Sequence, residues 1–168
     1  MANPSGGIAL MLPASESFGP VVVGGLAAAG IEEGSADFAQ CLFAAQTVLD
    51  TWDPANTASF AVANGVPTLL LQNANDVTIP NAVVGAPISG TTPLGRFLGL
   101  TNVVASEPGF VAGERLFSRF NSGGHASVVL PTEDPAVTVE MQTQIVSFLS
   151  SPRDNKGVMV ANPTVLLQ

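Results

Sequence analysis

The spacing of apolar residues along the chain predicts two amphipathic helices. Between residues 35 and 52, apolar side chains recur at steps of three and four, and Ser35 stands at the N-cap position. The same spacing predicts a helix over residues 135–150, which follows Asp134 and has Pro135 at its first position. Because each helix has one apolar stripe, we expect both to pack that stripe against a sheet.

Two runs of strand length predict the sheet. Residues 66–72 form an almost continuous apolar run, which is typical of a strand buried on both faces of a parallel sheet. Residues 115–120 largely alternate between apolar and polar side chains and predict a second strand. The tail, residues 153–168, offers a last strand that Pro163 would place at an edge. Since an open sheet usually has about five strands, the sequence predicts an α/β fold that is incomplete in one chain, with a mainly parallel sheet flanked by helices.

The remaining segments contain many turn-forming residues. Residues 1–34 are rich in glycine, proline and serine and predict an irregular lead-in to a single domain that spans residues 1–168. The pair Asp53-Pro54 is expected to stop the first helix. Residues 81–113 form a long connection that is typical of a lid or a pocket loop, with a short helix expected over residues 94–100. The alternative is a passive surface connection.

Composition and charge exclude several classes of function. The chain has 5 basic and 13 acidic residues, and no lysine or arginine precedes Arg96, so nucleic-acid binding is excluded. One cysteine, Cys41, and one histidine cannot build a disulfide framework or a known zinc site, and we expect neither a metal nor a cofactor. The sequence predicts no signal peptide, and prolines and asparagines interrupt its longest uncharged stretch, residues 54–75, so no transmembrane segment is expected.

Two chemically useful side chains follow the two predicted strands. Asp76 comes shortly after residues 66–72, and His125 follows residues 115–120 in a glycine-rich turn. Because the carboxyl ends of parallel strands meet at one edge of a sheet, we expect the Asp76 carboxylate to bond one imidazole nitrogen of His125 and to fix its tautomer. This pair is the acid and base arm of a nucleophilic triad. The alternative is a turn-forming aspartate and an unrelated surface histidine.

Four segments of the chain resemble α/β-hydrolases. Residues 66–80 (VPTLLLQNANDVTIP) and 123–131 (GGHASVVLP) resemble the acid loop and the histidine loop of that superfamily. Residues 3–9 (NPSGGIA) and 17–20 (SFGP) resemble, more narrowly, bacterial extracellular lipases of the virulence-factor-lipase or Pla-1/cef type. The resemblance implies that the chain is the carboxyl-terminal part of an α/β-hydrolase fold, with an extracellular location. It also implies that Asp76 is the triad acid and His125 the triad base.

The expected nucleophile is missing from this pattern. In α/β-hydrolases a serine on a G-x-S-x-G turn precedes the acid and the histidine along the chain. No serine in this sequence has glycine at both of those positions, and Ser5, which comes nearest, follows no predicted strand. The resemblance therefore implies that the nucleophile lies before residue 1, and we expect self-association or a missing amino-terminal half to complete the site.

These features favour a carboxylic-ester hydrolase, an esterase or lipase that acts on a small ester or a lipid. His125 would accept the serine proton and later activate water, while Asp76 would stabilise the imidazolium. One alternative is a non-catalytic, truncated hydrolase fragment that acts only in assembly or interaction. A third hypothesis is a dehalogenase or another acyl-transfer variant of the same fold, because a fold does not fix its chemistry.

Overall fold

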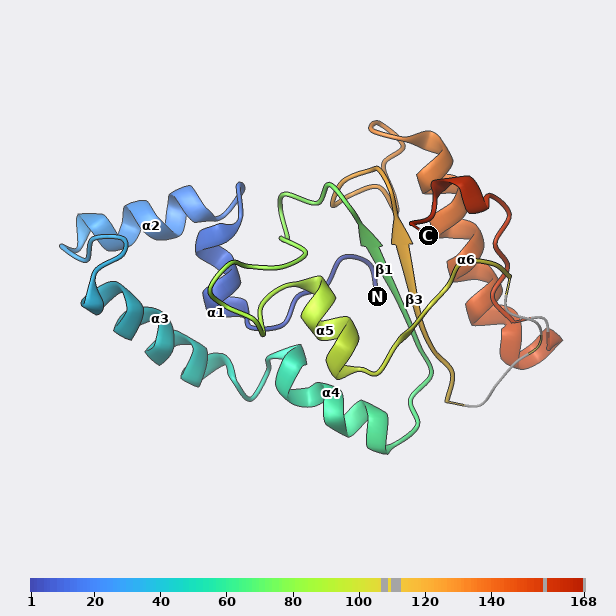
Figure 1. The fold of residues 1–168 in the computed structure, drawn as a ribbon, viewed down its shortest axis with the longest axis horizontal. Coiled ribbons are helices and arrows are strands. Elements are labelled where there is room, and N and C mark those ends of the chain that lie inside the picture. Colours follow the sequence, from blue (N-terminus) through green and yellow to red (C-terminus); the bar gives the residue numbers. More distant parts are fainter. Residues whose placement is uncertain (107–108, 110–112, 156, 168) are drawn as a thin grey trace.

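The computed structural model describes residues 1–106, 109, 113–155 and 157–167, and its centre is a parallel sheet with the strand order β1-β3-β2 (Figure 1). Strands β1 (Thr68–Asn73) and β3 (Arg115–Phe120) pair over their whole length. Both strands predicted from the apolar pattern are therefore confirmed. The short strand β2 (Thr101–Asn102) pairs with the other side of β3 and was not predicted, because its two exposed polar residues carry no apolar signal.

Helices cover both faces of the sheet, which confirms the mixed α/β character. Helix α6 (Pro135–Asp154) packs on one face, and α4 (Pro54–Ala63) and α5 (Thr91–Phe97) pack on the other. All six residues of β1 are buried, as expected for a strand covered on both sides. The core on the α6 side comprises Leu69, Leu71, Val103, Leu116, Phe120, Val137, Met141, Val158, Val165 and Leu166. The core on the other side comprises Ala58, Leu70, Leu94, Leu98 and Phe117.

The first residues of the chain lie beside β1, on the side opposite β3. Ala2 forms a parallel bridge with Leu71, and the Leu71 N–H donates to the Met1 carbonyl over 2.8 Å. The Met1 amino group donates to the Leu69 carbonyl, and burial lowers the pKa of this amino group. This segment therefore adds one short parallel bridge to the edge of the sheet beside β1 (Figure 1).

The expectation of an irregular segment over residues 1–34 is wrong. Its first part contains α1 (Ile8–Met11), followed by a 3₁₀ turn, and its second part is α2 (Gly19–Ala28). Helix α2 has no charged residue and no distinct polar face, so its sequence lacks the periodicity by which amphipathic helices are found. Pro20 in its first turn fits a helix start, where no backbone N–H is needed.

Helix α3 (Ala36–Leu49) is confirmed, but its expected packing on the sheet is wrong. The Ser35 hydroxyl accepts a hydrogen bond from the Phe38 N–H, as the N-cap prediction requires. The helix packs against α1 instead, and α2 and α3 lie at one end of the molecule, away from β1 and β3 (Figure 1). As a result, Trp52 at the end of the predicted stripe is 82% exposed. Periodicity identifies the apolar face of a helix but does not identify its partner.

Asp53 begins a helix rather than only ending one. Pro54 is the first residue of α4, and the fully buried Asp53 carboxylate accepts from the Ala55 N–H at its start. The same carboxylate accepts from the Gly7 and Ile8 N–H groups and from the Gln46 amide. Burial alone would raise the pKa of Asp53, but these hydrogen bonds outweigh it and lower the pKa. One carboxylate therefore joins the starts of α1 and α4 to α3.

We expect Asp53→Asn to destabilise the chain at neutral pH by about 2–3 kcal/mol, because an amide NH₂ would face two of the present donors. A lowered carboxyl pKa contributes stability above the unfolded pKa, and this stability is lost as the pH falls through the folded pKa. The wild type should therefore lose stability below about pH 4, and the variant should lose less over the same range. Thermal unfolding between pH 3 and 7 measures this, with the exposed first-turn residue Asp37→Asn as control. Equal losses for both variants would contradict the role of Asp53.

The expected tail strand over residues 153–168 is also wrong. Helix α6 continues to Asp154, residues Pro163–Val165 form a 3₁₀ turn, and a single antiparallel bridge joins Leu166 to Phe120. The buried Glu140 carboxylate of α6 holds the tail instead, since it accepts from the Ala161 and Asn162 N–H groups over 3.1 and 2.8 Å.

Part of the long connection over residues 81–113 packs against the sheet or pairs with it. The helix expected over residues 94–100 begins three residues earlier, as α5, and β2 follows it. Residues 107–108 and 110–112 of this connection lie outside the described residues. In the described parts of the chain, no single helix has the length and apolar composition of a membrane span, and only the pair 8–14 and 19–28, bent by 96°, meets both conditions together.

Candidate active site

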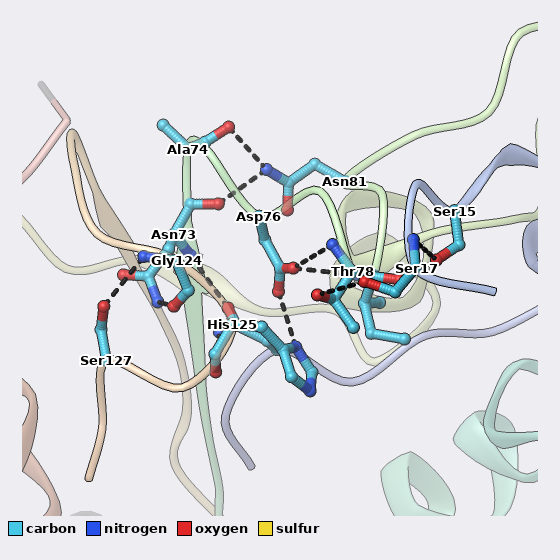
Figure 2. A network of polar contacts seen from close by, with 12 residues as sticks. Ser15, Ser17, Asn73, Ala74, Asp76, Thr78, Asn81, Gly124, His125 and Ser127 are labelled. Carbon is cyan, nitrogen blue, oxygen red and sulfur yellow. Dashed lines mark hydrogen bonds and ion pairs between the residues drawn. The ribbon is translucent and has the colours of Figure 1, made fainter. Parts of the chain in front are cut away.

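The two predicted site residues meet at the carboxyl ends of β1 and β3. The last paired residues of these strands are Asn73 and Phe120, so the loops that follow leave the sheet at the same edge. Within these loops, His125 Nδ1 lies 2.9 Å from Asp76 Oδ2 (Figure 2). The predicted contact between Asp76 and His125 is therefore confirmed, and the parallel pairing of the two strands is its cause.

The Asp76 carboxylate is buried and has a separate partner for each oxygen. Its Oδ1 accepts from the Thr78 N–H over 3.0 Å and from the Ile79 N–H over 2.9 Å, and its Oδ2 faces the imidazole. The side chain of Asp76 is 0% exposed. The turn that Asp76 forms with its own loop thus leaves Oδ2 in one orientation. Asp76 therefore forms its turn through Oδ1 and contacts the imidazole through Oδ2.

His125 presents one ring nitrogen to Asp76 and leaves the other available. Because a carboxylate only accepts hydrogen bonds, the neutral imidazole carries its proton on Nδ1, and Nε2 keeps a lone pair. The side chain is 43% exposed, and Nε2 has no hydrogen-bond partner among the described residues. An imidazole held in this state can accept a proton at Nε2 from a reacting group.

The glycines before His125 are explained by their surroundings. Gly123 has φ = 83°, a left-handed conformation that disfavours residues with a side chain. A Cβ on Gly124 would lie 2.3 Å from a carboxylate oxygen of Glu133, so the missing side chain makes room for Glu133 rather than for the ring. The Gly124 N–H donates to the Ser127 hydroxyl over 2.8 Å, which closes the turn around His125.

Two asparagines that the sequence analysis did not single out support these loops: Asn73 connects the loop of Asp76 to the loop of His125, and Asn81 binds the end of β1 within the first of these loops. The Asn73 amide donates to the Gly124 carbonyl over 2.8 Å, and the Asn81 amide donates to the Asn73 carbonyl over 2.8 Å (Figure 2). Asn73 is 0% exposed, so these bonds are shielded from water. The available signal was the series of asparagines around Asp76, at positions 73, 75 and 81.

The serines near these loops already have partners. Ser5, the nearest match to a nucleophile in the sequence, is buried and donates to the Gly6 carbonyl. Ser15 donates to the Thr78 carbonyl, and Ser17 bonds the Thr78 hydroxyl, so both attach the start of α2 to the acid loop (Figure 2). Ser127 accepts from Gly124, as described above. Within the described residues, no hydroxyl is hydrogen-bonded to Nε2 of His125.

An apolar cavity lies away from this pair. Its volume is about 490 Å³, and it lies around the start of β1, whereas Asp76 follows the end of that strand. Leu94 and Leu98 of the long connection line it, together with residues of α4 and α6 and with Met1 and Ala2. The long connection, which was expected to form a lid or a pocket loop, thus lines a cavity at the opposite end of β1 from Asp76 and His125.

Comparisons with known proteins add no relative. No family model matches the sequence, and neither a curated protein nor a solved structure matches it. Among the described residues, no group of three or more His, Cys, Asp or Glu side chains is arranged to hold a metal ion. The geometry of the loops after β1 and β3 is therefore the observation on which a function can be proposed.

Proposed function

We propose that this chain supplies the acid and the base of a carboxylic-ester hydrolase, an esterase or lipase of the α/β-hydrolase type. The supporting observation is the 2.9 Å contact between His125 Nδ1 and a buried Asp76 carboxylate at the ends of two paired parallel strands. The substrate would be a small ester or a lipid. No cofactor takes part in this chemistry.

The proposed reaction proceeds through two acyl-transfer steps. Nε2 of His125 takes the proton of a serine hydroxyl while the serine oxygen attacks the ester carbonyl. The imidazolium then gives that proton to the alcohol as the ester C–O bond breaks, which leaves an acyl-serine. Water attacks this intermediate and gives a proton to Nε2, and the imidazolium passes that proton to the serine oxygen as the acyl–serine bond breaks, which releases the acid and the free serine. Asp76 stabilises the imidazolium in both steps.

The serine is proposed to come from another polypeptide segment, on a second copy or on an amino-terminal half missing from this chain. Such a segment would fit beside residues 1–3, because a parallel strand there would end at the same edge as β1 and β3. Neighbouring strands lie about 4.8 Å apart, so the loop after such a strand would come near His125. Met1 and Ala2 also line the cavity at the start of β1. No charged side chain lines that cavity.

Hydrolysis of a short-chain chromogenic ester by the purified full chain tests the proposed function. We expect release of p-nitrophenol from p-nitrophenyl butyrate above the buffer rate, with a rate per chain that rises with protein concentration if a second copy completes the site. A rate equal to that of buffer at every concentration would contradict completion of the site by a second copy of this chain. Association without any ester hydrolysis would instead support the alternative, a non-catalytic fragment that acts in assembly.

We expect the chain to associate in solution, because three apolar residues that line the cavity at the start of β1, Met1, Val66 and Leu149, are exposed. Light scattering at micromolar concentration should give a mass of at least twice 17.1 kDa. Thr57→Glu, which places a charge on the exposed wall of the cavity in α4, should lower this mass. Thr47→Glu on α3 is the matched control, because both threonine hydroxyls bond a carbonyl four residues earlier. A uniform 17.1 kDa particle for the wild type would contradict association.

A further inference from the structure

Asn3, from the NPSGG segment near the start of the chain, lies beneath the histidine loop in a costly conformation. Its φ is 45°, a left-handed value that residues other than glycine adopt rarely, with asparagine among the most tolerant. Asn3 is also only 2% exposed. A buried polar residue in such a conformation is maintained by its contacts, so these contacts indicate its role.

The Asn3 carboxamide joins the end of β1 to the histidine loop. Its Oδ1 accepts from the Asn73 N–H over 3.0 Å, and its Nδ2 donates to the His125 carbonyl over 3.0 Å. The Asn3 backbone N–H donates to the Leu71 carbonyl over 2.8 Å, which fixes the base of the side chain to the sheet. A carboxamide suits this position because it offers an acceptor and a donor, whereas a carboxylate offers only acceptors.

The carboxamides of Asn3 and Asn73 together fix the backbone of the residue that carries the imidazole. Asn73 binds the carbonyl of Gly124, and Asn3 binds the carbonyl of the next residue, His125. Consecutive carbonyls that are both bonded cannot rotate without breaking a buried hydrogen bond, which is costly. Among the described residues, the other hydrogen bond of His125 is the one between its ring and Asp76.

We infer that Asn3 is a positioning residue that holds the backbone of His125, and through it the imidazole, against Asp76. The inference deepens the proposed function and rests on it, since the position of Nε2 matters only if the imidazole transfers protons. Asn3 reaches the site through the backbone of His125 and takes no proton itself. The position of His125 thus depends on a residue that lies 122 positions earlier in the sequence.

Nuclear magnetic resonance of the full chain tests the inference without any substrate. The chain has one histidine, so its imidazole signals belong to His125 alone. In the wild type we expect one tautomer, protonated at Nδ1, with a downfield Nδ1–H signal that the Asp76 bond protects from exchange with water. In Asn3→Gly, glycine suits the left-handed backbone and the carboxamide is absent, so we expect loss of this signal and a mixture of tautomers.

Two further variants make the comparison independent of folding. Asn3→Asp keeps the acceptor for Asn73 but places a second oxygen against the His125 carbonyl, and we expect the same loss of the Nδ1–H signal. Asn64→Ala removes a carboxamide bond to a carbonyl at the exposed end of α4, which leads into the start of β1 rather than into its end, where Asp76 follows, and should leave the signal intact. Wild-type signals in Asn3→Gly or Asn3→Asp would overturn the inference. Loss of the signal in a chain that hydrolyses no ester at any concentration would support the positioning role and contradict a hydrolase site completed by a second copy.

Discussion

His125→Ala is expected to lower kcat for ester hydrolysis roughly 10²- to 10⁴-fold, the usual contribution of a general acid–base group. The physical reason is the loss of Nε2, the atom that takes the serine proton and returns it to the leaving alcohol. KM should change little, because the ring is proposed to act on protons rather than to bind the ester. Initial rates with p-nitrophenyl butyrate, for the wild type and the variant at equal concentration, measure the effect.

Loss of folding cannot account for such a result if stability is measured in parallel. The His125 side chain is 43% exposed, but its removal leaves Oδ2 of the buried Asp76 carboxylate without its partner, so we expect a loss of stability of only about 1–3 kcal/mol and a chain that stays folded. Gln142→Ala is a suitable control, since its exposed amide also reaches a carbonyl near this loop, that of Val128. A His125→Ala protein that retains the wild-type rate would show that the imidazole takes no part in the hydrolysis.

Asp76→Asn is expected to reduce kcat by up to about 10⁴-fold, the effect of the equivalent change in a serine protease triad. The substitution keeps the size of the side chain and an acceptor for the Thr78 and Ile79 N–H groups. However, its NH₂ would face Nδ1 of His125, which then becomes the acceptor. The proton moves to Nε2, so the imidazole can no longer take a proton from serine.

Asp134→Asn provides the matched control for this change. Like Asp76, Asp134 accepts hydrogen bonds from two backbone N–H groups, those of Ala136 and Val137. It also accepts a hydrogen bond from the hydroxyl of Ser122, which precedes the glycines before His125. The Ser122 bond and these backbone bonds lower the pKa of Asp134. We expect this variant to lose some stability but to keep its rate of hydrolysis. Equal rates for Asp76→Asn and the wild type would show that Asp76 only forms its turn.

The sheet and the meeting of the two site residues could be predicted because both follow from local sequence signals. Residues 66–72 and 115–120 carry the apolar pattern of buried strands, and β1 and β3 confirm them. Parallel pairing then leaves little choice for the loops that follow, so the contact of Asp76 with His125 was predictable without knowledge of any other contact.

Other parts depended on contacts between distant segments and could not be predicted. Asp53 reads as the end of one helix, but its carboxylate meets Gly7 and Ile8, which are more than forty residues away. Asn3 lies among turn-forming residues in the sequence. Nothing near it indicates that its side chain binds the carbonyl of His125. The described residues of the tail form no strand, and the buried Glu140 carboxylate binds the backbone of Ala161 and Asn162 instead. In each case a buried polar side chain forms hydrogen bonds with residues that are distant in the sequence, and local patterns carry no information about such bonds.

The most direct test of the proposed acid and base pair is a comparison of ester hydrolysis rates for four proteins: the wild type, Asp76→Asn, His125→Ala and the double variant. If the two side chains act as one unit, the double variant is as slow as His125→Ala alone, because Asp76 acts only through the imidazole. If the two losses multiply in the double variant, Asp76 and His125 act independently, and the proposed pair is contradicted.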